Sequence, residues 1–261
     1  MPELPDLIFY KRLFDKTALN KKIKHVEVKA KGILKGISGE NLNALLKGKA
    51  FQSSAVYGKH LFTELEKKTG LDMHFGMTGK LILIGKDEEL PKSARVIFEF
   101  DNDEKLVFVD QRKIGYISTA EDLPALIAEK KLGPDARDVS KEEFIKLLKD
   151  KRASVKSVLM DQSLIAGIGN VYADEILFQA KIHPLKSIRE LGDEELALIW
   201  DKMKHVIDTA LKYQASRKKL PQGFVIPFRK KGATCPNGNG KIELIKVGGR
   251  STYFCPVCQK Q

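Results

Sequence analysis

The spacing of apolar residues divides the chain into a β-rich half and a helical half. The first half opens with apolar residues at helical spacing between positions 4 and 10, which predicts a short leading helix. Polar and apolar residues then alternate in short runs to about residue 120. In the clearest run, VIFEFDNDEKLVFVD, the residues Val96, Phe98 and Phe100 share one face before a polar turn. This half therefore predicts a β-sandwich or barrel behind a leading helix.

Helical periodicity takes over after residue 140. Ser140 begins the sequence S-K-E-E, which has the form of a capping box, and apolar residues follow it at helical spacing. A longer apolar stripe runs from Leu196 to Ala210 and is typical of a helix that buries one face. The second half is thus predicted to be helical.

The end of the chain returns to alternation. The segment KIELIKVGGRSTYF alternates on both sides of Gly248 and Gly249, which predicts a β-hairpin with a glycine turn. We therefore expect an α+β protein in three parts. These are a β-sandwich domain at 1–136, a helical domain at 137–227 and a hairpin module at 228–261.

The charge of the chain indicates a polyanionic partner. Lys and Arg number 46 against 34 Asp and Glu, which gives a net charge of +12 and a sequence pI near 9.4. Residues 228–261 hold seven basic residues and one acidic residue, so this segment alone nets +6. Half of the excess is thus concentrated in the hairpin module, where it favours binding to nucleic acid.

The sequence also shows no signal for a membrane. The chain has no apolar run near the roughly 20 residues that span a bilayer, and its start lacks the apolar core of a signal peptide. These features predict an intracellular protein of the cytoplasm that works without a membrane.

The three cysteines indicate a metal site rather than disulfides. An odd number of cysteines crowded near one end of a chain is a poor disulfide framework. Cys235 precedes Cys255 by 20 positions, and Cys255 and Cys258 enclose Pro-Val, a spacing typical of a zinc ribbon. Gly238 stands where a four-cysteine ribbon would have its second ligand. The sequence therefore leaves open whether the hairpin binds zinc, and it indicates no organic cofactor.

A glycine-rich turn separates two predicted helices at Gly167-Ile168-Gly169. Asn170 follows and is suited to cap the next helix, whose first backbone N–H groups would then favour a phosphate. Lys156 on the preceding helix would add positive charge. A helix-turn-helix that reads bases in the major groove is the alternative, but a glycine-rich turn offers few base-reading side chains.

The first residues, MPELPDL, carry a candidate nucleophile. Removal of Met1 would expose the secondary α-amine of Pro2, and an α-amine loses its proton at roughly pH 8, well below a lysine. A deprotonated amine can attack a carbonyl-like carbon. From these residues alone the simpler interpretation, a helix start, is favoured, because proline and acidic residues both favour the first turn of a helix.

Five motifs in order resemble the formamidopyrimidine-DNA glycosylase and endonuclease VIII family of base-excision repair enzymes. They are MPELPDL, HFGMTGKL, DQRKIG, GIGNVYADEILF and GGRSTYFCPVC, and they span the length of the chain. The resemblance implies an N-terminal β-sandwich and a helix-two-turn-helix domain with a finger hairpin. It also implies a monomer that binds double-stranded DNA with damaged bases or abasic sites, with the damaged nucleotide flipped out of the stack.

The resemblance assigns catalytic roles to three residues. The amine of Pro2 would attack C1′ of the damaged nucleotide, and Glu3 would be the acid that protonates the sugar ring oxygen. Lys59, in VYGKHLF, matches a turn lysine that reaches the phosphates of the lesion. Asp6 stands where the family commonly has glutamate, so its role stays open.

The resemblance also assigns DNA contacts. Lys156, Asn170 and Arg250 match a phosphate clamp that would bind any base sequence. Residues 216–228 lie where the family has a flexible loop over the flipped base. The residues that would fill the gap left by that base are Met77, Arg112 and Ile114, the last of which departs from the aromatic residue often found there.

Three functions are therefore open from the sequence. The favoured one is a bifunctional glycosylase and lyase for oxidised purines such as 8-oxoguanine and formamidopyrimidines, indicated by Met77 and Arg112. The second is an endonuclease VIII-like enzyme for oxidised pyrimidines, indicated by Ile114 and the unfamiliar loop. The third is a basic zinc-ribbon protein that binds nucleic acid without chemistry. A proline-based tautomerase is disfavoured, because it would need neither the basic hairpin nor the glycine turn.

Overall fold

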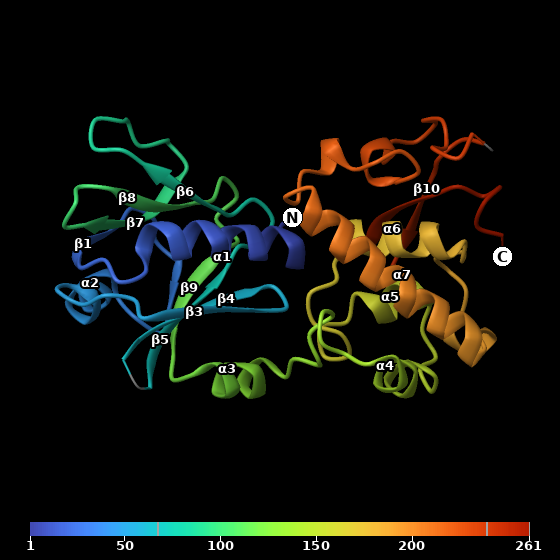
Figure 1. The fold of residues 1–261 in the computed structure, drawn as a ribbon, viewed down its shortest axis with the longest axis horizontal. Coiled ribbons are helices and arrows are strands. Elements are labelled where there is room, and N and C mark those ends of the chain that lie inside the picture. Colours follow the sequence, from blue (N-terminus) through green and yellow to red (C-terminus); the bar gives the residue numbers. More distant parts are fainter. Residues whose placement is uncertain (67, 239, 261) are drawn as a thin grey trace. The chain divides into compact units, whose positions relative to one another are not determined.

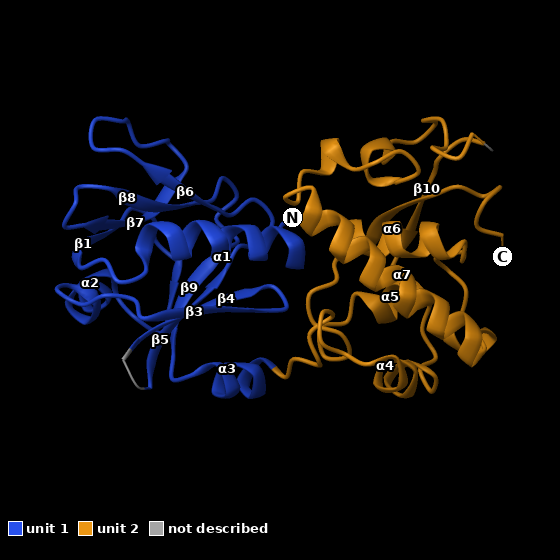
Figure 2. Ribbon diagram, viewed as in Figure 1, with its two compact units in different colours: residues 1–130 blue, residues 131–261 orange. Residues whose placement is uncertain are grey.

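The computed structural model describes residues 1–66, 68–238 and 240–260, which group into two compact units (Figure 2). The first unit covers residues 1–130 and the second covers residues 131–261. The hairpin module expected at 228–261 thus belongs to the same unit as the helices. The two parts form one unit because side chains of the helical segment, those of Lys156 and Asn170, donate hydrogen bonds to residues of the hairpin.

The first unit is the β-rich half (Figure 1). Its helices are α1 (Leu4–Ala18), α2 (Gly39–Leu46) and α3 (Leu123–Lys130). Its strands are β1 (Ile23–Val28), β2 (Leu34–Lys35), β3 (Ser53–Tyr57), β4 (His60–Glu66), β5 (Thr69–His74), β6 (Lys80–Ile84), β7 (Ala94–Phe100), β8 (Lys105–Val109) and β9 (Tyr116–Ala120).

These strands form two sheets, which confirms the predicted sandwich with a leading helix. One sheet has the order β1-β7-β8-β6, and the other has the order β2-β9-β5-β4-β3. Helix α1 packs against strands of both sheets. Its Phe14 makes an edge contact with Phe51, and Phe51 makes another with Phe98 of β7. The core therefore anchors α1, and with it the first residues of the chain.

Strand β7 departs from simple alternation. Val96, Phe98 and Phe100 are buried as expected, but Ile97 between them is also only 3% exposed. Ile97 belongs to a second apolar cluster on the other face of the sheet, together with Ile84 and Val107. The sheet is thus covered on both faces at this strand.

The second unit contains the helices and the hairpin. Its helices are α4 (Lys141–Leu148), α5 (Val155–Leu159), α6 (Asn170–Ala180) and α7 (Asp193–Lys212), with short 3₁₀ turns at η1 (Ile188–Glu190), η2 (Arg217–Lys219) and η3 (Ile226–Phe228). The Ser140 hydroxyl accepts a hydrogen bond from the Glu143 backbone, so the predicted cap of α4 is confirmed. Within the described ranges, no helix is both long enough and apolar enough to cross a membrane.

The predicted hairpin is also confirmed. Strands β10 (Glu243–Val247) and β11 (Arg250–Phe254) pair antiparallel, with Val247 opposite Arg250. Gly248 and Gly249 between them have φ angles of +54° and +72°, a left-handed conformation that glycine adopts at little cost. Strand β11 packs against α6.

Candidate functional site

The N-terminus is held by the first turn of α1. Glu3 is the N-cap residue, and its backbone N–H donates a 2.8 Å hydrogen bond to the carboxylate of Asp6 in that turn. Pro2 is buried and Glu3 is 0% exposed. The sequence suggested either a helix start or a reactive terminus. The structure is compatible with both, because Glu3 caps the helix and this cap also fixes the backbone beside Pro2. Asp6, whose role was open, is one of the residues that make this cap.

Lys59 lies in the tight turn between β3 and β4. Gly58 before it has φ +56°, and Lys59 itself is half-buried. Sequence analysis missed the polar group beside this turn. His60 and Asp72 form a buried pair with 2.8 Å between Nδ1 and Oδ1, and the ring of His74 lies 5.1 Å from that of His60. Burial and the neighbouring His60 lower the pKa of His74 to about 4, so its ring is neutral at pH 7.

One buried carboxylate organises the loops that carry Met77, Arg112 and Ile114. Asp110 accepts hydrogen bonds from the backbone N–H groups of Arg112 at 3.2 Å and Ile114 at 2.8 Å, and from the Thr78 hydroxyl. Burial alone would raise the pKa of Asp110, but these bonds outweigh it and lower the pKa. Met77 is half-buried, while Arg112 and Ile114 are exposed. The fold thus brings together the three residues that the resemblance grouped.

The same two loops meet backbone to backbone at Gly76. A Cβ atom at this position would lie 2.5 Å from the backbone nitrogen of Gly115, and Gly76 also has φ +55°. Any other side chain would force the loops apart. The absence of a side chain at Gly76 therefore allows the loop that carries Met77 to lie close to the loop that carries Arg112.

The glycine turn of the second unit differs in detail from the prediction. The N-cap of α6 is Gly169, and Asn170 is the first helical residue rather than the cap. The Asn170 side-chain amide instead donates a 3.0 Å hydrogen bond to the backbone oxygen of Ser251 on β11. Arg250, next to Ser251, is exposed. The structure thus brings Asn170 next to the strand that carries Arg250.

Lys156 requires a correction. Its side chain is 0% exposed, its ammonium lies 2.6 Å from Oδ1 of Asp174, and it donates a 2.6 Å hydrogen bond to the Thr252 hydroxyl. An ammonium enclosed in this way is not accessible to a phosphate. Lys156 contacts Asp174 and Thr252 within the fold instead of making the expected phosphate contact. Lysine is almost always exposed, and the sequence pattern gave no sign that Lys156 is buried.

The loop expected over a flipped base is anchored at its far end. The backbone N–H groups of Val225 and Ile226 donate to the carboxyl group of Glu175 on α6, at 3.2 and 2.8 Å. Burial raises the pKa of Glu175 to about 7, although the hydrogen bonds it accepts act in the opposite direction. Lys218 and Lys219, near the start of the loop, are exposed.

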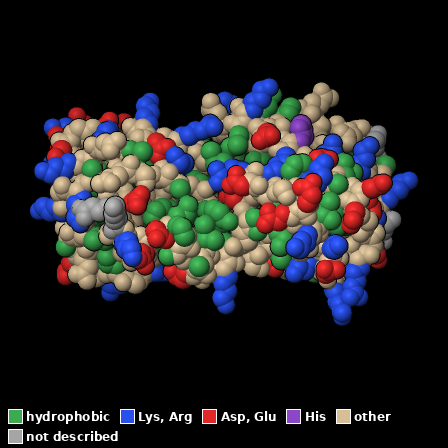
Figure 3. Space-filling view, turned by 60° about the horizontal axis from the view of Figure 1, so that its bottom comes forward, with side chains coloured by type: hydrophobic (Ala, Val, Ile, Leu, Met, Phe, Trp, Pro, Cys, Tyr) green, Lys and Arg blue, Asp and Glu red, His purple; other side chains and the backbone are tan. Residues whose placement is uncertain are grey.

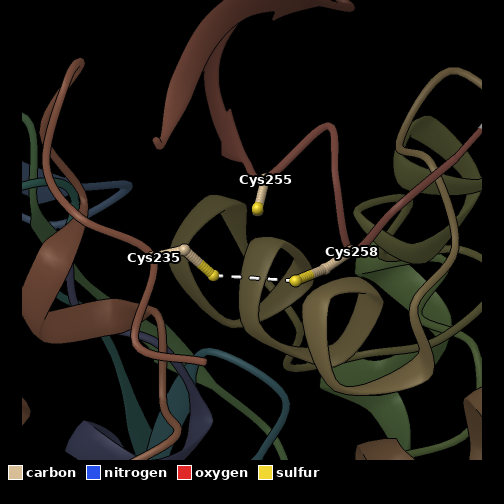
Figure 4. Close-up of side chains that lie close together, drawn as sticks. All are labelled: Cys235, Cys255 and Cys258. Carbon is tan, nitrogen blue, oxygen red and sulfur yellow. Dashed lines mark hydrogen bonds between the residues drawn. The ribbon is translucent and has the colours of Figure 1, made fainter. Parts of the chain in front are cut away.

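The three cysteines converge on one point (Figure 4). Their Sγ atoms all lie within 4.8 Å of one another, and Cys235 and Cys258 are separated by 3.6 Å between sulfurs. Thiolates around one zinc ion lie roughly 3.8 Å apart, as Zn–S bonds of about 2.3 Å in a tetrahedron require. The donor set therefore fits three of four zinc positions. Gly238 adds no side-chain ligand, and the nearby Asn239 lies outside the described residues.

Charges of both signs are interspersed over the face of the molecule in Figure 3. The excess of Lys and Arg is therefore not gathered into a single patch on this face. The charge on this face therefore does not by itself indicate where DNA would bind. Candidate DNA contacts must be judged residue by residue, and Arg250 on the hairpin is exposed.

Comparison with known proteins accounts for this combination of features. Residues 1–117 match the formamidopyrimidine-DNA glycosylase N-terminal domain, residues 132–221 match the H2TH domain of the same enzymes, and residues 240–261 match a zinc finger found in FPG and IleRS. A formamidopyrimidine-DNA glycosylase of Desulforamulus reducens is 32% identical over 275 residues, which cover 100% of this chain and 99% of that protein. One of Wolbachia pipientis is 34% identical, covering 99% and 100%.

Solved structures agree with these relatives. The formamidopyrimidine-DNA glycosylase of Lactococcus lactis, bound non-covalently to DNA with an AP site, superposes with a TM-score of 0.89 at 31% identity and full coverage of both chains. A mutant of that enzyme in complex with DNA containing Fapy-dG gives a TM-score of 0.91 at 30% identity, again with full coverage. Similarity over the whole length, in sequence and in fold, shows that this chain belongs to the formamidopyrimidine-DNA glycosylase family.

Proposed function

We propose that this chain is a bifunctional DNA glycosylase and AP lyase that excises oxidised purines from double-stranded DNA. The observation that carries the proposal is the N-terminus, where Pro2 and Glu3 lie buried and adjacent at the capped start of α1. A structural helix start needs no buried glutamate at the N-cap, because an exposed serine or aspartate serves as well. An enzyme acting on DNA would work inside the cell, as the sequence predicts.

The proposed reaction begins at the amine of Pro2 once Met1 is removed. The nitrogen lone pair forms a bond to C1′ while the glycosidic C–N bond breaks, and the base leaves with its bonding electrons and takes up a proton. The attacking nitrogen loses its own proton, and Glu3 gives a proton to the ring oxygen. The nitrogen lone pair then forms the C=N bond of an iminium between Pro2 and C1′ as the bond from C1′ to the ring oxygen breaks and the sugar opens. Loss of a proton from C2′ sends the C–H bonding electrons into the iminium and forms an enamine. The enamine then returns these electrons to expel the 3′ phosphate, which leaves with the electrons of its C3′–O bond. A second elimination expels the 5′ phosphate.

Binding is proposed to rest on phosphates rather than on bases. Arg250 and Lys59 would supply positive charge, and Asn170 a neutral donor, so that affinity is independent of base sequence and depends on salt. Met77, Arg112 and Ile114 would occupy the space left by the flipped nucleotide. Their loops are held by Asp110 and Gly76, which limits how far they can move when the stack opens.

Zinc is proposed for the three thiolates. Their Sγ atoms lie within 4.8 Å of one another, close enough for one tetrahedral zinc ion to bind all three. The ion would be structural and would join β11 to the segment around Cys235. It has no part in the reaction on the sugar, which is assigned to Pro2 and Glu3.

The alternative substrate is an oxidised pyrimidine, which the aliphatic Ile114 favours. Oxidised purines are supported by the relatives, which are named formamidopyrimidine-DNA glycosylases, and by the Lactococcus lactis mutant whose complex holds Fapy-dG. The two substrates are separated by incising duplexes that each hold one defined lesion. We expect release of 8-oxoguanine and Fapy-guanine and strand ends that carry phosphate on both sides of the gap. Preferential release of thymine glycol would select the alternative.

Glu3→Gln tests the chemical assignment in the same assay. It should lose excision of an intact lesion but retain more activity on abasic sites, because the acid is needed chiefly while the base is still attached. Equal loss on both substrates would assign Glu3 to the helix cap alone. Binding without any strand cleavage by the unaltered chain would favour a protein that binds nucleic acid without chemistry.

A further inference from the structure

The carboxylate of Asp174 joins three distant segments of the second unit. It lies within α6 and is 1% exposed. Its Oδ1 is 2.6 Å from the ammonium of Lys156 on α5. Its Oδ2 accepts hydrogen bonds from the guanidinium of Arg229 at 2.7 and 3.0 Å, and from the backbone N–H of Tyr253 on β11 at 3.1 Å. One buried anion thus binds two cations and a strand of the hairpin.

Both cations also bind the hairpin directly. Lys156 donates a 2.6 Å hydrogen bond to the Thr252 hydroxyl, and the guanidinium of Arg229 lies 4.9 Å from the centre of the Tyr253 ring. Asn170 adds a hydrogen bond to the backbone of Ser251. Three consecutive residues of β11 are therefore each tied to the helices or to Arg229, and the exposed Arg250 immediately precedes them.

Charge makes this attachment specific. Two cations surround one carboxylate in a site with little solvent, so Asp174 is needed to compensate them. Charge-assisted hydrogen bonds are short and directional, which favours one placement of the strand over nearby ones. Removing the carboxylate would leave two enclosed positive charges and free the Tyr253 backbone N–H.

Apolar contacts also join the hairpin to the helices, because Ile242 and Cys255 cluster with Phe178 of α6 and Phe254 packs against the ring of His183. Such contacts are less directional than charge-assisted hydrogen bonds. An isolated two-stranded hairpin is marginally stable in water, and this one has three cysteine ligands where four would complete a zinc site. We propose that Asp174, with Lys156 and Arg229, positions the hairpin on α6 and so sets the place of Arg250 for DNA binding, in addition to any bound metal. The DNA-binding part of this inference rests on the proposed function.

The first test is hydrogen exchange on the full chain. Asp174→Asn retains the size of the side chain and an acceptor for Tyr253, but removes the charge. We expect faster exchange at residues 243–254, with exchange in α7 unchanged. Asp208→Asn, the same change at an exposed position on α7, is the matched control and should alter neither region. Unchanged protection of the hairpin in Asp174→Asn would overturn the proposal.

The second test is a double-mutant cycle in binding to a duplex with a stable abasic-site analogue. Independent sites combine to within about twofold in affinity. If Asp174 acts by placing Arg250, then Arg250→Ala should weaken binding in the unaltered chain but change it by less than about twofold in the Asp174→Asn background. Full additivity of the two changes would overturn the positioning role.

Two further arms keep the outcomes separate. If Asp174→Asn does not fold, Arg229→Gln removes one of the two cations instead and is expected to loosen the hairpin and lower affinity in the same direction. An unchanged hairpin in Arg229→Gln would then count against the proposal. If the unaltered chain binds no DNA, the proposed function fails, while the exchange experiment still decides whether Asp174 holds the hairpin.

Discussion

The backbone N–H of Glu3 donates a 2.8 Å hydrogen bond to the carboxylate of Asp6, three residues along the chain. This bond begins α1 and fixes the peptide that follows Pro2. Apolar contacts of α1 with both sheets then hold the helix in the core. The candidate nucleophile is therefore attached to a rigid element, as a reaction that depends on the position of one amine requires.

Asp6→Ala should loosen this attachment. Loss of a helix-capping interaction costs about 1 kcal/mol, so we expect a modestly lower melting temperature. A larger effect is expected on the rate of a single turnover, because the Pro2 amine would lose its fixed approach. Asp6→Glu, which restores the residue common in the family, is the control and should retain both properties. A lower melting temperature with an unchanged rate would show that Asp6 stabilises the helix without positioning the amine.

Arg250→Ala should weaken binding to damaged and undamaged duplexes alike. If one phosphate contact is lost, the slope of log affinity against log salt should fall by about one unit. Lys149→Ala, an exposed lysine at the end of α4, removes the same charge elsewhere and serves as the control. The measurement is a titration at several salt concentrations. An unchanged slope would remove Arg250 from the phosphate contacts.

Chelation should affect the hairpin only in part. Structural zinc in a complete site typically contributes roughly 10 kcal/mol or more to a small module. With Gly238 in place of a ligand, zinc held by Cys235, Cys255 and Cys258 would have an exchangeable fourth ligand and a lower affinity. Since the helices also hold β11, mild chelation should reduce activity partly and reversibly. One tightly held zinc per chain, with complete loss of activity on its removal, would contradict this expectation.

Stability should fall in mild acid because of His74. Its pKa in the folded protein, about 4, lies below the ordinary value near 6.5, so the unfolded chain takes up the proton first. The stability from the neutral ring is present above pH 6.5 and is lost as pH falls through 4. It amounts to at most about 3 kcal/mol at 1.36 kcal/mol per pKa unit. Denaturant unfolding from pH 4 to 7 should show a shallower decline in His74→Gln.

The control for this experiment is His25→Gln, a histidine exposed on β1. It should retain the pH dependence of the unaltered chain, since other groups that titrate are common to all three proteins. The same slope in His74→Gln as in the unaltered chain would show that His74 does not govern this range of pH.

The elements of this fold could be predicted because they follow local patterns. The alternation at Val96, the N-cap at Ser140 and the glycines at 248 and 249 are local signals, and the folded protein has the structure that each predicts. Ile97 was less predictable, because burial on the second face of β7 depends on what the rest of the chain places there.

The polar interior could not be predicted in the same way. Lys156 and Asp174 are charged residues of ordinary helical segments. They form a buried pair because β11 and Arg229, which are distant in sequence, pack against them. Asp110 and the pair of His60 and Asp72 are likewise defined by partners distant in sequence or across strands. Family motifs indicated which residues to examine, but the contacts decided whether Lys156 faces a phosphate or the protein.

Covalent trapping at the N-terminus tests the central claim most directly. Borohydride added while the chain acts on abasic-site DNA should reduce the iminium to a stable amine and leave one protein–DNA adduct. Mass spectrometry of the digested adduct should find the sugar remnant on Pro2 of a chain that lacks Met1. An adduct on Lys59 or another lysine, or a chain that retains Met1 and yet cleaves the strand, would contradict the assignment of Pro2 as the nucleophile.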